Sequence, residues 1–240
     1  MTRFAIFLAA ALTSVCSLAS AAETAPLPAF HAEYDVLRNG KIMGKATLDL
    51  HHAQGDNWEF INQTKGTSGM AALAGIDVRE VSTFHWRNGL PESLQYQYTQ
   101  KSAIKTRQRG IVFDWSKNSA ASHDGSQQWT VALKPGSVDR NLAVLAVAAD
   151  LKRGSKSLSY PVLDSDTVAD KVYAIKATET LDLPAGKLSA MRVERERNDN
   201  PNKHNTSWHA AERGFLPVQI EQQDKGDTIT MKLVLLQLNK

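Results

Sequence analysis

Residues Ser137–Gly154, SVDRNLAVLAVAADLKRG, form the long run of helix-forming apolar residues that follows the N-terminal segment of the chain. Between Leu142 and Ala149 this stretch has no charged residue and no helix breaker, so a helix here is apolar on nearly all of its sides. Its length of about 15 residues falls short of the roughly 20 apolar residues that cross a bilayer. The sequence therefore predicts a helix over about residues 138–153 that other parts of the protein cover.

The residues at both ends of this stretch mark the helix boundaries. Ser137 can cap the first turn, and Asp139 places a negative charge near the N-terminus, where the helix dipole favours it. Lys152 and Arg153 place positive charges in the last turn. Gly154 follows them at the position where a helix often ends in a left-handed residue.

Most of the remaining sequence alternates between apolar and polar residues, which is typical of β-strands. The Asn39-Gly40 pair lies between two alternating runs and indicates a tight hairpin. Leu94, Tyr96 and Tyr98 share one face of a half-buried strand. We count about eleven strands in this way. The expected fold class is all-β, mainly β with one principal helix: a curved, partly closed antiparallel meander packed on that helix.

Two segments interrupt the alternation. Residues 116–127, SKNSAASHDGSQ, are polar and contain Asp124-Gly125, which is typical of a turn. Residues 68–77, SGMAALAGID, are small and apolar, and they fit a short helix and a mobile flap equally well. Because we see no internal repeat and no long linker, we expect one β-rich domain over residues 30–240, preceded by a leader over residues 23–29.

The first residues have the form of a secretory signal peptide. Arg3 precedes an apolar segment, Phe4–Leu18, and small residues follow up to a cleavage site that ends at Ala21 or Ala22. We predict that residues 1–22 are cleaved. The mature protein is then expected in the periplasm, without a membrane-spanning segment.

Cysteine usage and net charge exclude several classes of protein. The single cysteine, Cys16, lies in the signal peptide, so the mature chain has no disulfide framework and no thiolate nucleophile. Val15 precedes it where a lipid-anchored protein needs a small residue. A net charge of +3 is too small to indicate nucleic acid as a partner. The basic clusters Lys101–Arg109 and Arg192–Arg197 fit solvated sheet faces, with anionic lipid head groups or glycan polymers as alternatives.

Some groups of histidines and carboxylates are candidates for chemistry. Zinc binds His nitrogens and carboxylate oxygens, and paired carboxylates hydrolyse glycans. The groups are His204 and His209 with Asp199 and Glu212, the pair Asp164 and Asp166, and the pair Glu194 and Glu196. The histidine spacing matches no zinc pattern, and arginines interleave the last pair as on a salt-bridged surface. We therefore assign no catalytic residue and no metal ligand, and we expect no cofactor.

The aromatic residues lie in strand-like segments, where their ordinary role is the core. A functional alternative is that some of them line a concave sheet face that holds an acyl chain, since ligand cavities are largely apolar. The apolar helix would then be the plug of the cavity and residues Met70–Ile76 its lid. The cavity candidates are Met70, Leu73, Leu142, Leu145, Trp86 and Tyr96.

A resemblance to a known family rests on turn and core residues. These are the turn Pro184-Ala185-Gly186 before a strand with Val193-Glu194-Arg195, then Trp208 before Ala210, then Gly214-Phe215-Leu216-Pro217-Val218, and near the N-terminus Tyr34-Asp35-Val36 and Gly40 to Gly44. Over about residues 30–238 the chain resembles the bacterial domain-of-unknown-function family 3108. The resemblance implies a secreted envelope protein with a β-rich fold, and it carries over no catalytic residue. More distantly, the expected fold is similar to the lipoprotein-carrier folds of the periplasm.

The sequence thus favours a non-enzymatic, monomeric periplasmic protein. It is expected to bind an apolar ligand, such as a lipid or acyl chain, or another envelope component in the concave face of its sheet. Two alternatives stay open. One is a structural or interaction protein that docks on an envelope assembly, and the other is a hydrolase of cell-wall glycan or peptide.

Overall fold

The computed structural model describes residues 25–196 and 202–239. The predicted signal peptide, residues 1–22, lies outside the described residues. Within them, no helix combines the length and the apolar character that crossing a membrane requires.

The described residues form one sheet of fifteen strands and three short helical segments. The strands are β1 (Phe30–Arg38), β2 (Lys41–His52), β3 (Trp58–Gly66), β4 (Asp77–Arg87), β5 (Leu90–Lys101), β6 (Thr106–Asp114), β7 (Ser119–Asp124), β8 (Gln127–Ala132), β9 (Val138–Asp139), β10 (Leu158–Asp164), β11 (Thr167–Leu183), β12 (Gly186–Arg195), β13 (His204–His209), β14 (Pro217–Asp224) and β15 (Asp227–Leu238). The helical segments are α1 (Gly69–Leu73), α2 (Ala143–Lys152) and the 3-10 turn η1 (Ala211–Arg213).

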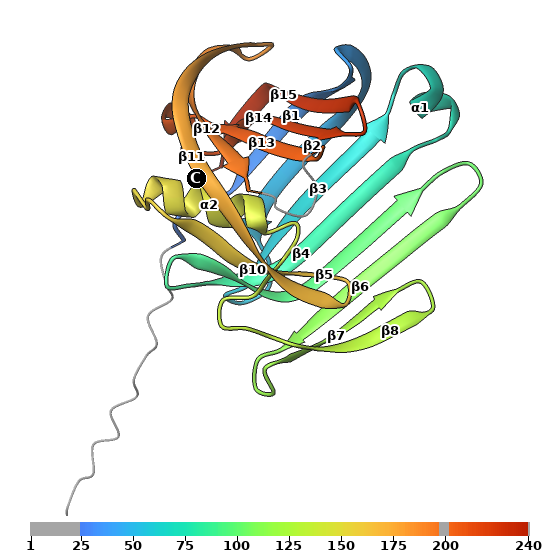
Figure 1. Ribbon diagram of the computed structural model, residues 1–240, viewed down its shortest axis with the longest axis vertical. Helices are drawn as coiled ribbons and strands as arrows, with labels where there is room; N and C mark the ends of the chain where they lie inside the picture. Colours follow the sequence, from blue (N-terminus) through green and yellow to red (C-terminus); the bar gives the residue numbers. More distant parts are fainter. Residues whose placement is uncertain (1–24, 197–201, 240) are drawn as a thin grey trace, which may run out of the picture.

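The sheet consists of two meanders joined along the first and last strands (Figure 1). Strands β1 to β8 lie side by side in chain order, and β9 to β15 do the same on the other side of β1. The join is antiparallel, with Tyr34 of β1 opposite Leu233 of β15. Every pairing is antiparallel except the two-residue contact of β9 with β10. The expected class, a mainly antiparallel all-β protein with one principal helix, is confirmed.

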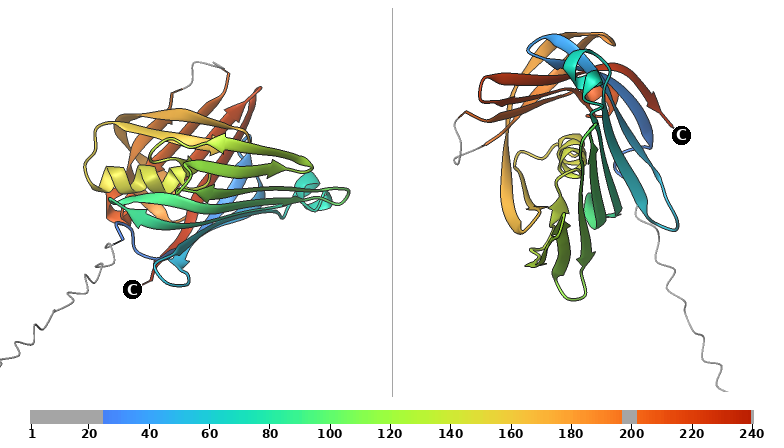
Figure 2. Two further views of the ribbon diagram at one scale, coloured as in Figure 1. Left: turned by 90° about the horizontal axis from the view of Figure 1, so that it is seen from below. Right: turned by 90° about the vertical axis from the view of Figure 1, so that its right-hand side faces the viewer.

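The sheet curls around α2 without closing into a barrel (Figure 2). Strands β8 and β9 are its two edges, and α2 connects edge strand β9 to β10. Strand β9 also packs on the inner face of β5, on the opposite side of the sheet. The helix therefore occupies the concavity, as the sequence predicts.

The local turn chemistry follows the sequence in several places. Asn39 and Gly40 have φ angles of 49° and 78°, which are both positive as a two-residue type I′ hairpin requires. Gly154 has a φ of 77° after the last turn of α2. The Ser155 N–H donates to the Asp150 carbonyl at 3.0 Å, and the Gly154 N–H donates to the Leu151 carbonyl at 3.0 Å. These two bonds form a Schellman motif, so the predicted C-terminal end of the helix is confirmed.

The predicted start of the helix is wrong by five residues. Val138 and Asp139 pair with Val162 and Leu163 as strand β9, and the helix begins at Ala143. Ser137 does not cap it, because its hydroxyl donates to the Lys134 carbonyl at 2.8 Å. Pairing with a distant strand thus prevails over the local capping signal.

The predicted number of about eleven strands is also too low. Residues 119–124, expected in a polar turn, form β7, because Ala120 and Ser122 alternate inward opposite Phe113 and Ile111 of β6. Residues 207–223 are divided between β13, η1 and β14, and Gly214 ends η1 with a φ of 66°. Residues 68–77, whose sequence fits a short helix and a mobile flap equally well, contain the one-turn helix α1.

The main core surrounds α2, whose small residues let the strands approach closely. Ala146, Ala148 and Ala149 are buried, and Leu145 is 0% exposed. Val144, by contrast, is only partly buried. The two neighbouring positions therefore test whether the helix is packed on all sides.

We expect Leu145→Ala to lower the free energy of unfolding by about 2–5 kcal/mol, because it removes packed side-chain atoms from a closed part of the core. Val144→Ala, at a partly open site, should cost about 1 kcal/mol or less. Chemical denaturation of both variants measures these differences. Equal costs at the two positions would contradict this view of the helix.

Candidate functional site

A cavity of about 500 Å³ lies on the concave face of the sheet beside α2. Its volume is in the range of small-molecule sites, about 300–1,000 Å³. Strands from both meanders contribute to its wall. The lining residues are Leu48, Asn62, Glu80, Arg140, Asn141, Ala143, Val144, Val147, Val162, Asp164, Lys171, Tyr173, Arg195, Lys203, Asn205, Thr206, Ser207, Ile220, Gln222 and Met231.

The inward positions of neighbouring strands build the wall. Ile220 of β14 lies directly opposite Met231 of β15 and opposite Ser207 of β13. Directly paired residues share a face of the sheet, so these side chains lie next to one another. Two residues further along the same strands, and therefore on the same face, Asn205 lies opposite Gln222. The wall therefore changes from apolar to polar along its length.

Helix α2 supplies the apolar floor. Ala143, Val144 and Val147 line the cavity. Val147 lies four residues after Ala143 and three after Val144, so all three share one side of the helix. Leu48 of β2 and Val162 of β10 extend this apolar surface on either side. The floor can therefore contact a hydrocarbon group.

Charged residues also line the cavity. Among the described lining residues, cations outnumber carboxylates, although Lys203 also forms an ion pair with Asp224, which lies outside the lining, at 3.1 Å. The cations are Arg140, Lys171, Arg195 and Lys203, and the carboxylates are Glu80 and Asp164. The cavity thus combines an apolar floor with a cationic wall.

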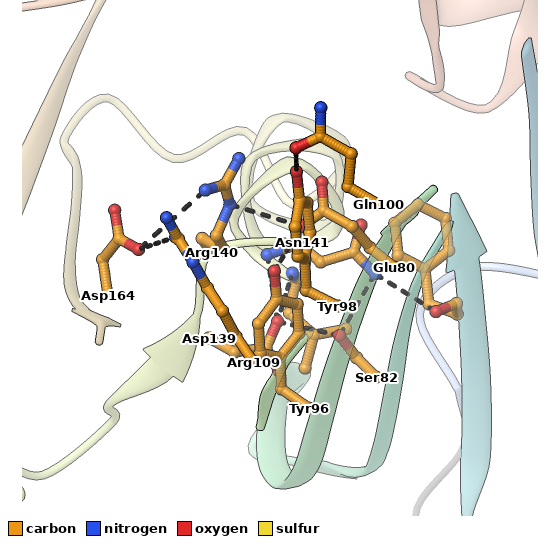
Figure 3. A network of polar contacts seen from close by, with 12 residues as sticks. Glu80, Ser82, Tyr96, Tyr98, Gln100, Arg109, Asp139, Arg140, Asn141 and Asp164 are labelled. Carbon is orange, nitrogen blue, oxygen red and sulfur yellow. Dashed lines mark hydrogen bonds and ion pairs between the residues drawn. The ribbon is translucent and has the colours of Figure 1, made fainter. Parts of the chain in front are cut away.

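Both carboxylates of the wall bind other side chains of the protein (Figure 3). Glu80 accepts a hydrogen bond from the Tyr96 hydroxyl at 2.6 Å and forms an ion pair with Arg140 at 3.3 Å. Asp164 lies 3.6 Å from Arg109 and 3.9 Å from Arg140. Burial, followed by the charge of Glu80, raises the pKa of Tyr96, so this phenol stays protonated and keeps its role as donor.

Below this layer, the carboxylate of Asp139 holds strand β9 to the opposite meander (Figure 3). Its Oδ1 accepts from the Ser82 hydroxyl of β4 at 2.8 Å, and its Oδ2 accepts from the Ser93 hydroxyl of β5 at 2.9 Å. Oδ1 also accepts from the backbone N–H groups of Asn141 and Leu142, at 3.0 and 3.1 Å. Asp139 therefore holds the turn just before the helix and joins the two sides of the curled sheet.

Asp139 is 0% exposed, and this burial raises its pKa to about 6. The hydrogen bonds from Ser82 and Ser93 act in the opposite direction, because they stabilise the charged form. Its carboxyl group does not line the cavity. We therefore interpret Asp139 as a structural group and not as an acid or base toward a ligand.

The six cavity candidates from the sequence occupy three kinds of place. Leu142 and Leu145 are buried in the main core, and Trp86 packs there against Phe84 at a centroid distance of 5.1 Å. Tyr96 is buried, and it lines a second hollow of about 580 Å³ over β5 to β8. Met70 and Leu73 are exposed on α1. The first cavity has none of the six in its described lining.

The structure thus assigns to the cavity residues that sequence reasoning missed. The helix is apolar on nearly all sides, so its pattern cannot distinguish the face of Val144 and Val147 from that of Leu145. Ile220 and Met231 show the strand alternation that indicates an inward face. That signal predicts burial, but it does not distinguish a packed core from a cavity.

The two histidines considered for metal binding, His204 and His209, lie in different environments. His209 is buried, its Nδ1–H donates to the Phe215 carbonyl at 2.8 Å, and its Nε2 accepts from the Ser207 hydroxyl at 2.9 Å. Burial lowers the pKa of His209 to about 4, so the ring is neutral near pH 7. His204 is exposed, and Asp199 lies outside the described residues. Among the residues that are described, no cluster of three or more metal-ligating side chains occurs.

Comparison with protein families gives one match. The family model described as "Protein of unknown function (DUF3108)" matches residues 30–234. No curated protein matches the chain.

Solved structures that are similar to this chain include the following two. One is a "Beta-barrel-like Protein of Domain of Unknown Function DUF1849" from Brucella abortus, with 10% sequence identity and a TM-score of 0.57, over 90% of this chain and 100% of the other. The second, "a putative lipoprotein" from Parabacteroides distasonis, has 10% identity and a TM-score of 0.34, over 89% of this chain and 97% of the other. The first likeness concerns the fold alone, and the second carries no argument.

The buried carboxyl of Asp139 makes the stability of the protein depend on pH. Its pKa is about 6 in the folded state and 3.8 in the unfolded chain, so between these values only the folded state keeps the proton. The contribution of Asp139 to the free energy of unfolding is therefore fully present below about pH 4, and it is lost as the pH rises through about 6. A shift of about two pKa units corresponds to about 3 kcal/mol.

Asp139→Asn removes this titration. We expect the free energy of unfolding of the wild type, relative to that of the variant, to fall by about 3 kcal/mol between about pH 4 and pH 7. Urea titrations across this range measure the difference. His209 contributes a slope of opposite sign, because its lowered pKa makes stability rise with pH, but it is present in both proteins and cancels. A constant difference would show that Asp139 does not titrate there.

Proposed function

The chain belongs to the DUF3108 family of proteins of unknown function, and from this premise we propose that it binds an amphiphilic ligand in its concave cavity. The ligand has an apolar chain and an anionic group, and the protein holds it without chemical change. The observation that carries the proposal is the cavity itself, with an apolar floor on α2 and a cationic wall.

The magnitudes favour a ligand that uses both parts of the cavity. Burying about ten methylene groups contributes about 8 kcal/mol. The loss of translational and rotational freedom on binding costs about 4–15 kcal/mol. An alkyl chain alone would therefore bind weakly, and charged contacts to Lys171 or Arg195 would raise the affinity and select the head group.

The state of the acidic groups supports a binding role over catalysis. Glu80 is engaged by Tyr96 and Arg140, and Asp164 lies near two arginines. A general acid or base needs a proton position within reach of the substrate. Here the carboxylates of the cavity are used to hold the wall together.

The envelope is the location that fits this function. The signal-peptide pattern of residues 1–22 supports export to the periplasm. Amphiphiles with acyl chains are the main constituents of the membranes on either side of that compartment. A soluble cavity would shield the acyl chain from water, which is the physical purpose of such a site.

The first test is the mass of the protein as purified from the periplasm. We expect native mass spectrometry to show an additional discrete mass that organic extraction recovers as an anionic lipid or fatty acid. Val144→Trp should weaken binding of a fatty acid by at least tenfold, because the indole fills the floor of the cavity. The matched control is Val172→Trp, at an exposed position of β11 outside the cavity lining.

Equal affinity of the Val144→Trp variant and the wild type would place the ligand elsewhere. A clean mass of the polypeptide alone, together with a melting temperature that fatty acids and phospholipids do not change, would contradict ligand binding. That result would favour docking on another envelope component instead.

A further inference from the structure

Two neighbouring loops at one end of the molecule expose large apolar side chains. Met70 and Leu73 of α1 are each 78% exposed, and Ile104 in the β5–β6 turn is 97% exposed. We call these three residues the loop tip. Figure 2 shows α1 and the adjacent β5–β6 turn at the far end of the molecule from α2. Large apolar side chains exposed together indicate an interaction surface.

The two loops form one unit. The Ala103 N–H of the β5–β6 turn donates to the Ala74 carbonyl after α1, at 2.9 Å. The flanking strands β4 and β5 are adjacent, with Asp77 opposite Lys101. The three apolar side chains therefore project from a single protrusion.

The backbone of this protrusion forms most of its hydrogen bonds internally. After Ser68, the N–H groups of Ala72, Ala74, Gly75 and Ile76 donate to carbonyls of the same loop. In the turn, the Ser102 N–H donates to the Lys105 carbonyl at 2.9 Å. Unsatisfied backbone groups make entry into hydrocarbon costly. The loop tip avoids much of that cost, so its side chains can enter an apolar phase.

Three exposed lysines lie on the strands and the turn that carry the loop tip. Lys65, Lys101 and Lys105 form no ion pair with any residue in the described part of the chain. We call them the lysine collar. Asp77 is the acidic residue between Lys65 and Lys101 in the strand register, and it accepts a hydrogen bond from Gln63 at 3.0 Å. The collar therefore keeps a net positive charge.

We propose that the loop tip docks on a bilayer that contains anionic phospholipids. The apolar side chains enter the outer part of the acyl-chain region, and the lysine collar contacts the phosphates. Aliphatic tips with flanking lysines match the two phases of such a surface, an apolar interior and an anionic head-group layer.

A protein partner fits the same residues less well. Interface cores of protein complexes are enriched in aromatic residues and arginine and are depleted of lysine. Here the exposed residues are aliphatic, the cations are lysines, and the surface is a protrusion. This docking surface shares no residue with the cavity lining, so it stands whether or not the cavity holds a ligand.

Vesicle binding of the mature chain tests the proposal. The probes are vesicles of phosphatidylglycerol with phosphatidylcholine and vesicles of phosphatidylcholine alone, separated by flotation. We expect the wild type to bind the anionic vesicles, with binding that weakens as salt is added. The variant M70S/L73S/I104S should bind at least tenfold more weakly. The matched control V112S/V172S/L235S removes exposed apolar side chains from strands and should bind like the wild type.

The lysine collar is tested by K65Q/K101Q/K105Q, which should lose most of the preference for anionic vesicles. Depth of insertion is measured separately, because Cys16 is the single cysteine and the mature chain has none. A fluorescent label on Leu73→Cys should shift its emission to shorter wavelength with vesicles, and the same label on Val172→Cys should not. Either an absence of vesicle binding or equal binding by the loop-tip variant overturns the proposal. Capture of one envelope protein by a photo-crosslinker at residue 73, without vesicle binding, would overturn it in favour of a protein partner.

Discussion

The buried carboxylate of Asp139 is the contact on which the rest of the arrangement depends. A curled sheet with free edges needs an interaction that holds its two sides together, and here the Asp139 carboxylate bonds to Ser82 of β4 and Ser93 of β5. The backbone N–H of Asp139 adds a further bond to the Ser93 hydroxyl at 2.8 Å. The negative charge of Asp139 is costly to bury, and the hydrogen bonds that its carboxylate accepts offset part of this cost. Two of the donors are the N–H groups of Asn141 and Leu142, so the same carboxylate also holds the turn that leads into α2.

The cavity is a consequence of how α2 is held. Small residues such as Ala146 and Ala149 allow close packing on one side of the helix, while Val144 and Val147 face the wall built by β13 to β15. Above them, Arg140 forms ion pairs with Glu80 of β4 and Asp164 of β10, which belong to the two different meanders. This polar bridge ties the sheet across the cavity in the same way as Asp139 does below it. The apolar floor therefore lies beside a layer of charge, and an amphiphile suits that arrangement.

The predictable parts of the structure are those that local chemistry decides. The Asn39-Gly40 hairpin and the Gly154 terminus need positive φ angles, and the sequence shows them. The start of α2 was not predictable, because Val138 and Asp139 pair with strand β10, and the hydroxyl partners of Asp139 are 46 and 57 residues away along the chain. The cavity was not predictable either, since strand alternation indicates an inward face whether that face is packed or open. Met70 and Leu73 were expected at a cavity wall on their apolar character alone, and their exposure is visible only in three dimensions.

The cavity wall and the loop tip lie toward the same end of the strands. Gln222 of the cavity is near the β14–β15 turn, and that turn is bonded to the β1–β2 hairpin through Asn39 N–H and the Thr228 carbonyl at 2.8 Å. The hairpin is bonded in turn to the α1 loop through the Thr67 N–H and the Met43 carbonyl at 3.0 Å. The β14–β15 turn, the β1–β2 hairpin and the α1 loop therefore follow one another along this end of the sheet. Since the two residue sets do not overlap, variants of one leave the other intact, and the two proposals can fail separately.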